Sequence, residues 1–385
     1  MTSKSKMEYS RAVAKRYLKA NGRKEKTKIL DEFCATASYS RKYAIDKLGG
    51  ISFRDPPPQR RSRKRLYSGE ADAALIQVWK HYGCLCAERL HPFLAEGLRK
   101  LEQFGHLKLA ESVKTELLNM SRPTVGRRIM GHQKRHGKGK GLSATRPGSL
   151  LKKHIPIRTQ SWDIAKAGFL EMDLVAHCGG SLLGDFIYTL QLEDIATTWT
   201  ERKAVMGKGQ KVVFSAITAA EKQFPFPILG MDSDNGSEFI NKLLWKYCEG
   251  KGIAFTRSRP YMKKDNAHIE QKNWPLVRKI LGYDRFDTVH QLRLINNLYD
   301  NELRLYLNFF QPSQKLQAKV RFGAKIRRKY DGAKTPYQRV MESPEATAEK
   351  KAELKALYES LDPVKLKKEI DRKIRIIISL VRLDS

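Results

Sequence analysis

Three acidic side chains are spaced along the middle of the chain in a pattern that suits metal-assisted chemistry. Asp173 interrupts an apolar run, and Asp234 ends a second apolar run directly before an Asn-Gly pair. Glu270 follows with thirty-five residues between it and Asp234. Carboxylate oxygens are preferred ligands of Mg²⁺, and two such ions about 3.5–4 Å apart serve phosphoryl transfer. The acids are therefore candidates for a two-metal site that acts on phosphate esters.

Each acid has a competing interpretation. Strand alternation puts Glu171 on the same face as Asp173, and Asp232 shares the parity of Asp234. We prefer Asp173 because it lies deeper in its strand, and Asp234 because it adjoins the turn. Asp173 could instead pair with a buried arginine, and Asp234 could serve only as a turn residue. Glu270 could simply complement the dipole of the helix that it begins.

The segments around these acids alternate between strand and helix patterns. An order of three strands, helix, strand, helix, strand and helix predicts a mixed α/β sheet. A strand that ends in an acid at the start of a loop is a common way to position a catalytic side chain. Strands are expected at 168–176, 185–192, 197–204, 227–231 and 253–256, and helices at 210–224, 237–250 and from about 266.

Taken together, the acids and their spacing resemble the DDE catalytic core of retroviral integrases and bacterial insertion-sequence transposases. Asp173 is followed by Ser233-Asp234-Asn235-Gly236 and then by Glu270. Further matches are Phe239, Pro260-Tyr261 and Asn273. The resemblance spans about residues 160–310. It implies an α/β ribonuclease H-like core with a mixed five-stranded sheet.

The resemblance also implies a mechanism. Asp173, Asp234 and Glu270 would hold two Mg²⁺ ions, with Mn²⁺ as a possible substitute. Water and then a DNA 3′-hydroxyl would attack a phosphodiester, without ATP or a covalent protein–DNA intermediate. Residues beside the acids would contact DNA ends, namely Asn235, Tyr261, His268, Lys272, Asn273 and Arg278.

The chain departs from this family in two ways. It lacks the His/Cys zinc module with which retroviral integrases begin. Pro275, five residues after Glu270, should also kink or end a helix, which affects the placement of Arg278. A separate group of His81, Cys84, Cys86 and His91 has no common zinc spacing, so we interpret these cysteines as buried thiols in a helical core.

The composition favours a nucleic-acid partner. Lys and Arg total 74 against 41 Asp and Glu, which gives a formal charge of +33. The sequence contains no run of about 18 apolar residues, so it predicts no membrane-spanning helix. The five cysteines do not form a disulfide-scaffold pattern, which suggests a reducing compartment. With no apparent signal peptide, we expect a cytoplasmic, nucleoid-associated protein of a bacterial host.

The N-terminal part predicts all-α helix-turn-helix DNA-binding units. Residues 1–52 form the first, with Arg41 and Lys42 at the start of its recognition helix, although an ordinary three-helix bundle is the alternative. Residues 53–69 are a basic linker in which Arg60 and Arg61 suit phosphates.

A second helical unit is expected over residues 70–135, followed by a second basic linker over 136–160. Its candidate recognition helix carries Arg122, Arg127 and Arg128. Two such units in series would recognise a long, bipartite DNA site.

The catalytic core is placed at 161–310, and 311–385 is a basic C-terminal region with helices. A long helix is expected over 287–310, and a basic strand pair or extended arm over 315–330 would suit a phosphate backbone. In the last helix, the apolar face could pack against a partner. That face consists of Ile370, Ile374, Ile377 and Val381.

The sequence therefore predicts a DNA transposase that binds element ends and cuts and joins DNA strands. It would act on element ends and target DNA as a homodimer or a larger assembly. One alternative is a ribonuclease H-like nuclease that cleaves without joining. Another is a DNA-binding regulator with a vestigial core.

Overall fold

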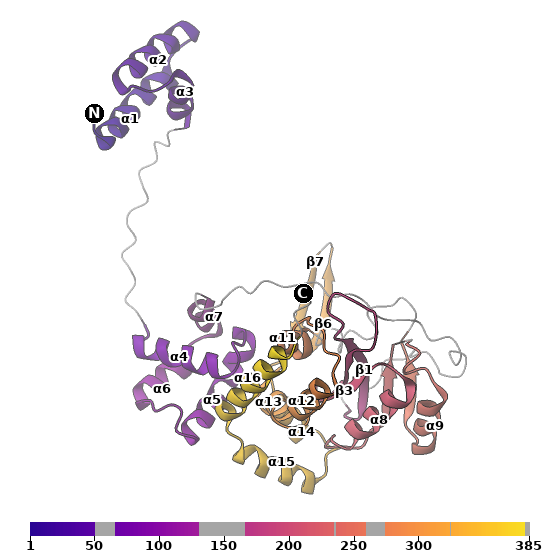
Figure 1. The fold of residues 1–385 in the computed structure, drawn as a ribbon. Coiled ribbons are helices and arrows are strands. Elements are labelled where there is room, and N and C mark those ends of the chain that lie inside the picture. The colour runs from indigo at the N-terminus through magenta and orange to yellow at the C-terminus, as the bar shows by residue number, and fades with distance from the viewer. Residues whose placement is uncertain (51–65, 131–165, 235, 259–273, 324, 382–385) are drawn as a thin grey trace. The chain divides into compact units, whose positions relative to one another are not determined.

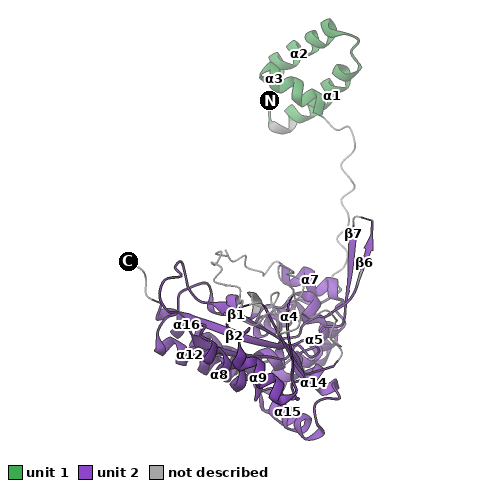
Figure 2. Ribbon diagram, turned by 90° about the vertical axis from the view of Figure 1, so that its right-hand side faces the viewer, with its two compact units in different colours: residues 1–66 green, residues 67–385 purple. Residues whose placement is uncertain are grey.

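The computed structural model of the chain describes residues 1–50, 66–130, 166–234, 236–258, 274–323 and 325–381. They divide into two compact units, residues 1–66 and 67–385, shown in green and purple in Figure 2. Each unit has its own hydrophobic core.

The first unit is a bundle of three helices, which confirms that this region is all-α. Phe33 and Leu48 are fully buried at its centre, and Thr2 caps the first helix by accepting a hydrogen bond from the Ser5 N–H. Ser38 has a left-handed conformation that ends the second helix and begins a short turn. The helices are α1 (Ser3–Lys19), α2 (Arg23–Ala37) and α3 (Arg41–Gly50).

A five-stranded mixed sheet forms the centre of the second unit and confirms the predicted fold class. Its strand order is β3-β2-β1-β4-β5. The β1/β2 and β2/β3 pairs are antiparallel, whereas β1/β4 and β4/β5 are parallel. This is the arrangement of a ribonuclease H-like core. The strands are β1 (Phe169–Ala176), β2 (Ile187–Asp194), β3 (Thr200–Met206), β4 (Gly230–Ser233) and β5 (Ala254–Arg257).

A row of polar side chains crosses one face of this sheet. The register aligns Glu193 of β2, Glu171 of β1 and Asp232 of β4 in one row, and each is at most 1% exposed. The Thr256 hydroxyl donates to Asp232 at the end of that row. On the opposite face, residues such as Leu170, Met172, Leu190 and Leu192 are fully buried and form the hydrophobic core.

Two asparagines complete the outer edge of the sheet at β3. Asn308 accepts from the Thr200 N–H (3.0 Å) and donates to the Thr200 carbonyl (2.9 Å). Asn296 makes the same pair of bonds with Ala204, at 2.8 and 2.9 Å. The prediction of one helix over 287–310 is wrong, because the helix is interrupted at Asn301. The helices here are α8 (Gln210–Glu221), α9 (Lys242–Lys251), α12 (Val289–Asp300) and α13 (Glu302–Phe310).

The helices that precede the sheet share one core with the C-terminal helices. The fully buried Lys100 donates to the carbonyls of Tyr358 (2.6 Å) and Glu359 (3.1 Å), at the C-terminus of α15. Carbonyls at the end of a helix lack the full set of intrahelical partners and carry partial negative charge, so a cation stabilises them. The helices are α4 (Gly69–His81), α5 (Ala87–Gln103), α6 (Glu111–Leu118), α7 (Arg122–Met130), α14 (Pro336–Glu342), α15 (Ala348–Ser360) and α16 (Pro363–Ser379).

The last helix, α16, packs within its own chain. Ile370 and Ile377 are 3% and 0% exposed, and α16 contacts α12 and α13. The expectation that this apolar face is kept for a partner is therefore wrong. Figure 1 shows α16 beside these two helices.

The remaining described elements lie on either side of α12 and α13 in the sequence. A π-helical turn, η1 (Trp274–Arg278), contains Pro275 and leads into α11 (Lys279–Leu281). After α13, β6 (Leu316–Phe322) and β7 (Lys325–Tyr330) pair as an antiparallel ribbon, which confirms the predicted strand pair. None of the described helices is long and apolar enough to span a membrane.

Removal of Asn308 should destabilise the second unit. In Asn308→Ala, the buried N–H and carbonyl of Thr200 would lose their partners, at a cost of about 2–4 kcal/mol in the free energy of unfolding. All five tryptophans lie in the second unit, so urea unfolding followed by Trp fluorescence reports on it alone. Asn297→Ala, at an exposed position of α12, is the matched control and should change little.

The buried His177 should make stability depend on pH. Burial lowers its pKa to about 3, with a smaller contribution from Arg278, and its ring is hydrogen-bonded to the Thr189 hydroxyl (2.8 Å). The unfolded chain binds a proton near pH 6.5 and the folded chain does not. Stability should therefore fall as pH drops from 6.5 towards 3, by up to about 1.4 kcal/mol per pH unit.

His177→Phe should flatten this pH dependence in urea unfolding at pH 7, 6 and 5, whatever its effect on stability at pH 7. The exposed His290 provides the control, and His290→Gln should keep the parental slope. An unchanged slope in His177→Phe would show that other groups cause the pH dependence.

Candidate active site

Asp173 and Asp234 lie next to each other because β1 and β4 are parallel neighbours. Met172 pairs with Ser233 in the last pair of this register, and Asp173 and Asp234 are the residues that directly follow it on the two chain segments. Adjacent strands are about 4.8 Å apart, which brings two carboxylates on one face within reach of shared ligands. The structure thus brings together two of the three predicted acids.

The end of β4 distinguishes these acids from their competitors. Glu171 has Glu193 on one side and Asp232 on the other, and it is fully buried. Asp173 pairs with Gln191 of β2, lies one residue beyond the end of the β1/β4 register, and is partly exposed. Asp173 is therefore more accessible than Glu171.

The loop after β4 holds Asp234 in place. The Gly236 N–H donates to one Asp234 carboxylate oxygen at 2.9 Å, and the Ser233 hydroxyl donates to the Asp234 carbonyl at 3.1 Å. Asn241 caps α9 by accepting from the Leu244 N–H at 2.9 Å. The helix therefore begins at Lys242, later than the sequence pattern predicts.

Glu238 is a further acid of this loop that the sequence analysis does not identify. It is 5% exposed, and its Oε2 has no hydrogen-bond partner among the residues that the structure describes. A Cβ on Gly236 would lie 2.7 Å from the Glu238 carboxyl and 2.9 Å from Asp234 Oδ1. Glycine thus allows the two carboxylates to approach from either side of residue 236.

Burial dominates the electrostatics of this pair. It raises the pKa of Asp234, against the opposing effects of the Gly236 N–H and the Lys208 charge. Burial likewise raises the pKa of Glu238, and the negative charge of Asp234 adds to that rise. A cation bound here would favour the ionised form of both acids.

Lys208 is the nearby positive charge, and sequence reasoning also missed it. It lies in the loop between β3 and α8, where the Gln210 amide donates to the Ser237 carbonyl at 3.2 Å. That bond holds the loop after β3 against the loop after β4. A lysine within electrostatic reach of two acids can bind a phosphate beside them.

The donor set fits Mg²⁺ in its chemistry, because Asp173 and Asp234 supply carboxylate oxygens from adjacent strands. No group of three or more His, Cys, Asp or Glu side chains within the described ranges is placed to hold a metal ion. The third predicted acid, Glu270, lies outside the described residues, as do several predicted DNA contacts. These are Arg60, Arg61, Asn235, Tyr261, His268, Lys272 and Asn273.

The other predicted DNA contacts differ in their exposure. Arg278 is half-buried, its guanidinium lies 4.9 Å from the Tyr283 ring centre, and burial lowers its pKa. On α7, Arg128 pairs with Asp72 (3.0 Å), whereas Arg122 and Arg127 are exposed.

In the first unit, the two predicted contacts lie at the start of α3. Lys42 is exposed, and Arg41 forms an exposed ion pair with Asp31 of α2.

The prediction that Cys84 and Cys86 are buried thiols is wrong, because both are exposed.

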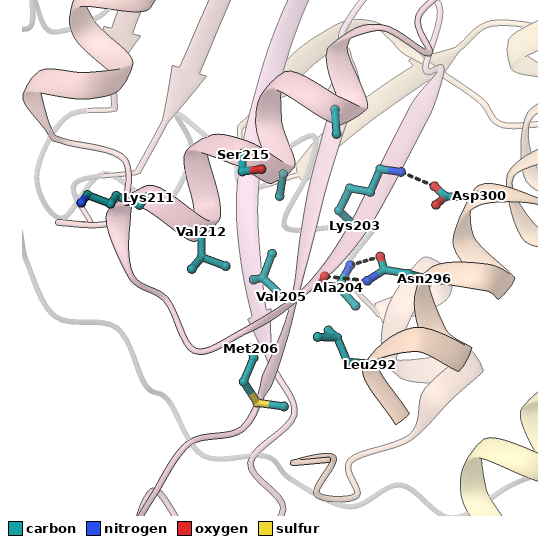
Figure 3. Close-up of a pocket in the computed structure, with 12 residues that line it drawn as sticks. Lys203, Ala204, Val205, Met206, Lys211, Val212, Ser215, Leu292, Asn296 and Asp300 are labelled. Atoms are coloured by element: carbon teal, nitrogen blue, oxygen red, sulfur yellow. Dashed lines mark hydrogen bonds and ion pairs between the residues drawn. The ribbon is translucent and has the colours of Figure 1, made fainter. Parts of the chain in front are cut away.

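A cleft of about 600 Å³ lies between α8 and α12 over β3, and Figure 3 shows its lining. Within this lining, Lys203 pairs with Asp300, and Asn296 is hydrogen-bonded to the backbone of Ala204. None of the acids described above lines it. The cleft is therefore separate from the candidate active site.

Comparisons with solved structures return integrases. The chain matches the catalytic core domain of BIV integrase at 17% identity and a TM-score of 0.30, covering 44% of this chain and 91% of that one. The HTLV-2 integrase catalytic core domain in complex with magnesium matches at 13% and 0.29, covering 38% and 91%. The simian T-cell lymphotropic virus intasome with the PP2A regulatory subunit B56 gamma matches at 13% and 0.31, covering 62% and 72%.

Because these TM-scores are low, the class of the fold rests on the strand order and register of the sheet, which define a ribonuclease H-like core. No protein-family model matches the chain. Its sequence is 37% identical over 343 residues to the uncharacterized protein y4rM of Sinorhizobium fredii, which covers 87% of this chain and 95% of that protein. The chain belongs to the same family as y4rM.

A side chain at residue 236 should disturb both acids. In Gly236→Ala, the new Cβ would force Glu238 and Asp234 apart, and we expect metal-dependent DNA cleavage to fall at least about tenfold, with 1.4 kcal/mol for each factor of ten. Gly250→Ala in α9 is the control, because a Cβ there has no atom within 4 Å. Equal cleavage by the two variants would show that the spacing of these acids is unimportant.

Proposed function

We propose that this protein is a DDE-type polynucleotidyl transferase that cuts and joins DNA strands, as bacterial insertion-sequence transposases do. The observation that supports the proposal is that Asp173 and Asp234 each directly follow Met172–Ser233, the last register pair of two parallel neighbouring strands. A single exposed acid in a loop has many uses, whereas two carboxylates at one strand end suit a metal-dependent phosphoryl transferase.

Three acids would form the catalytic set, with Glu270 completing the pair that the sheet positions. They would hold two Mg²⁺ ions, or Mn²⁺ in their place, which would stabilise charge on the attacking and leaving oxygens. The Gly236 N–H orients the Asp234 carboxylate through its 2.9 Å hydrogen bond. Lys208 would bind a phosphate of the DNA strand beside them.

The basic character of the chain supports DNA as the substrate, since a charge of +33 attracts phosphates. We propose that the first unit binds element ends as a helix-turn-helix module, with Lys42 and Arg41 towards the DNA. On α7, the exposed Arg122 and Arg127 would make a second contact. Two or more copies would hold paired ends and target DNA in the bacterial cytoplasm.

Two other functions are compatible with the same fold. A ribonuclease H-like nuclease would use the same acids to cleave without joining. A DNA-binding regulator would use only the helical units, and the acids would have no catalytic role. The partial exposure of Asp173, beside fully buried acids, favours an active site over a vestigial one.

A strand-transfer assay tests the proposal. The full-length chain is incubated with Mg²⁺, a labelled duplex from the DNA that flanks its gene, and a plasmid target. Asp234→Asn should abolish both cleavage and joining, by at least about a thousandfold, or about 4 kcal/mol in the activation barrier, because it removes a metal ligand. It should leave DNA binding intact, and EDTA should have the same effect on the parent protein.

Asp232→Asn is the matched control, because Asp232 lies two residues before Asp234, in β4. Asp232 is fully buried and accepts a hydrogen bond from the Thr256 hydroxyl. It should retain most of the activity. Cleavage without joined product would identify a nuclease, and DNA binding without cleavage in the parent protein would identify a regulator.

A further inference from the structure

The β6–β7 ribbon is the most exposed regular element of the second unit. All six residues of β7 are exposed, and so are the apolar Val320 (47%) and Phe322 (60%) of β6. A two-stranded ribbon with free edges is only marginally stable in water and invites pairing with other chains. The ribbon is seen to extend away from the rest of its unit in both Figures 1 and 2.

The ribbon is also strongly basic. Residues 316–330 contain six cations and no acid. The Arg327 guanidinium lies 5.5 Å from the Phe322 ring centre, so its charge stays at the surface. The cations are Lys319, Arg321, Lys325, Arg327, Arg328 and Lys329.

Cations lie on both faces of this ribbon. Residues that are directly opposite across an antiparallel pair share a face. Val320 pairs with Arg327 and Phe322 with Lys325, which places those cations on one face. Arg321 pairs with Ile326, so Arg321 lies on the other face, where the alternation of β7 also puts Arg328.

Hydrogen bonds and an ion pair hold the base of the ribbon, whereas its strands are largely exposed. Asp331 accepts a hydrogen bond from the Lys315 N–H (2.6 Å) and forms a mostly buried ion pair with Arg339 of α14 (2.8 Å). Arg339 also donates to the Ser313 carbonyl (2.9 Å), and Lys315 Nζ donates to the Ala196 carbonyl beside the sheet (2.8 Å). The fold thus holds an exposed arm in a defined direction.

We propose that the β6–β7 ribbon enters a groove of duplex DNA and neutralises phosphates of both strands. The major groove, about 12 Å wide, admits a two-stranded β-ribbon. A ribbon with cations on both faces can reach both walls of such a groove. This inference rests on the proposed function in that DNA is the substrate, and it adds a second DNA-contacting element outside the acids.

The distribution of charge argues against a membrane surface. A segment that lies on a membrane separates an apolar face from a charged one. Here Arg327 and Lys325 share their face with Val320 and Phe322, so no wholly apolar face exists. Single-stranded nucleic acid would offer phosphates but no groove, and this difference can be tested.

The test compares two triple variants of the full-length chain. Arg321→Gln with Arg327→Gln and Arg328→Gln removes three ribbon cations. The control, Lys355→Gln with Lys368→Gln and Arg375→Gln, removes three exposed cations from α15 and α16. Affinity for a labelled 30-base-pair duplex and for a single strand of the same length is measured by fluorescence anisotropy at several salt concentrations.

The ribbon variant should lose at least about tenfold in duplex affinity near 100 mM salt, and its log–log salt slope should fall by about 2–3, since each phosphate contact contributes about 0.9. The control should lose much less. An equal loss in both variants, or an equal loss on single strands, would overturn the proposal. Loss of binding to anionic vesicles with unchanged duplex binding would also overturn it.

Two duplexes separate the possible sources of the DNA. A loss confined to a duplex from the DNA flanking the gene would assign the ribbon to element ends, whereas a loss on an unrelated duplex as well would assign it to DNA in general. The result is independent of catalysis. If the parent protein fails to cleave but the ribbon variant binds weakly, the proposed function fails and the ribbon's role stands.

Discussion

The parallel pairing of β1 with β4 is the constraint on which the candidate active site depends. β1 extends over eight residues and β4 over four, so the shorter strand stops halfway along the longer one. Asp173 thereby lies in the middle of a central strand, one residue beyond the end of its pairing with β4. The same mismatch places Asp234 at the first loop residue, where a backbone N–H can orient it. A one-residue shift in this register would bring the segment that ends at Asp234 beside an apolar position of β1, Met172 or Leu174, on the other face of the sheet.

The β3 edge of the sheet and the β6–β7 ribbon are treated in opposite ways. At β3, Asn308 and Asn296 satisfy the N–H and carbonyl of Thr200 and Ala204, so these two positions of the edge are not available to another strand. At the β6–β7 ribbon, no such cap is present among the described residues, and positive charge takes its place. A cationic edge repels a second copy of itself but attracts phosphate. The contrast indicates that the ribbon is exposed for a polyanion rather than for another strand.

The sequence allowed the sheet to be predicted, because the signals of its strands are local. Apolar runs located all five strands, and strand parity narrowed the acids to Asp173 and Asp234 with one competitor each. Choosing between competitors depends on which strand ends first, which no local pattern states. Glu238 was missed for a related reason. The residues after Asn-Gly look like the start of a helix, whereas Asn241 caps the helix later, and Asn241 was the available signal.

Tertiary contacts account for the other differences. Val289 to Phe310 has a helical period throughout, but two separate helices allow Asn296 and Asn308 to face the same strand edge. Likewise, the apolar face of α16 looked unpartnered only because its neighbours, α12 and α13, come much earlier in the sequence. Lys208 stands in a short loop between two glycines and is unremarkable by type or spacing. It gains significance because the loops after β3 and β4 meet beside the acids, so a phosphate drawn to Lys208 would lie close to Asp234.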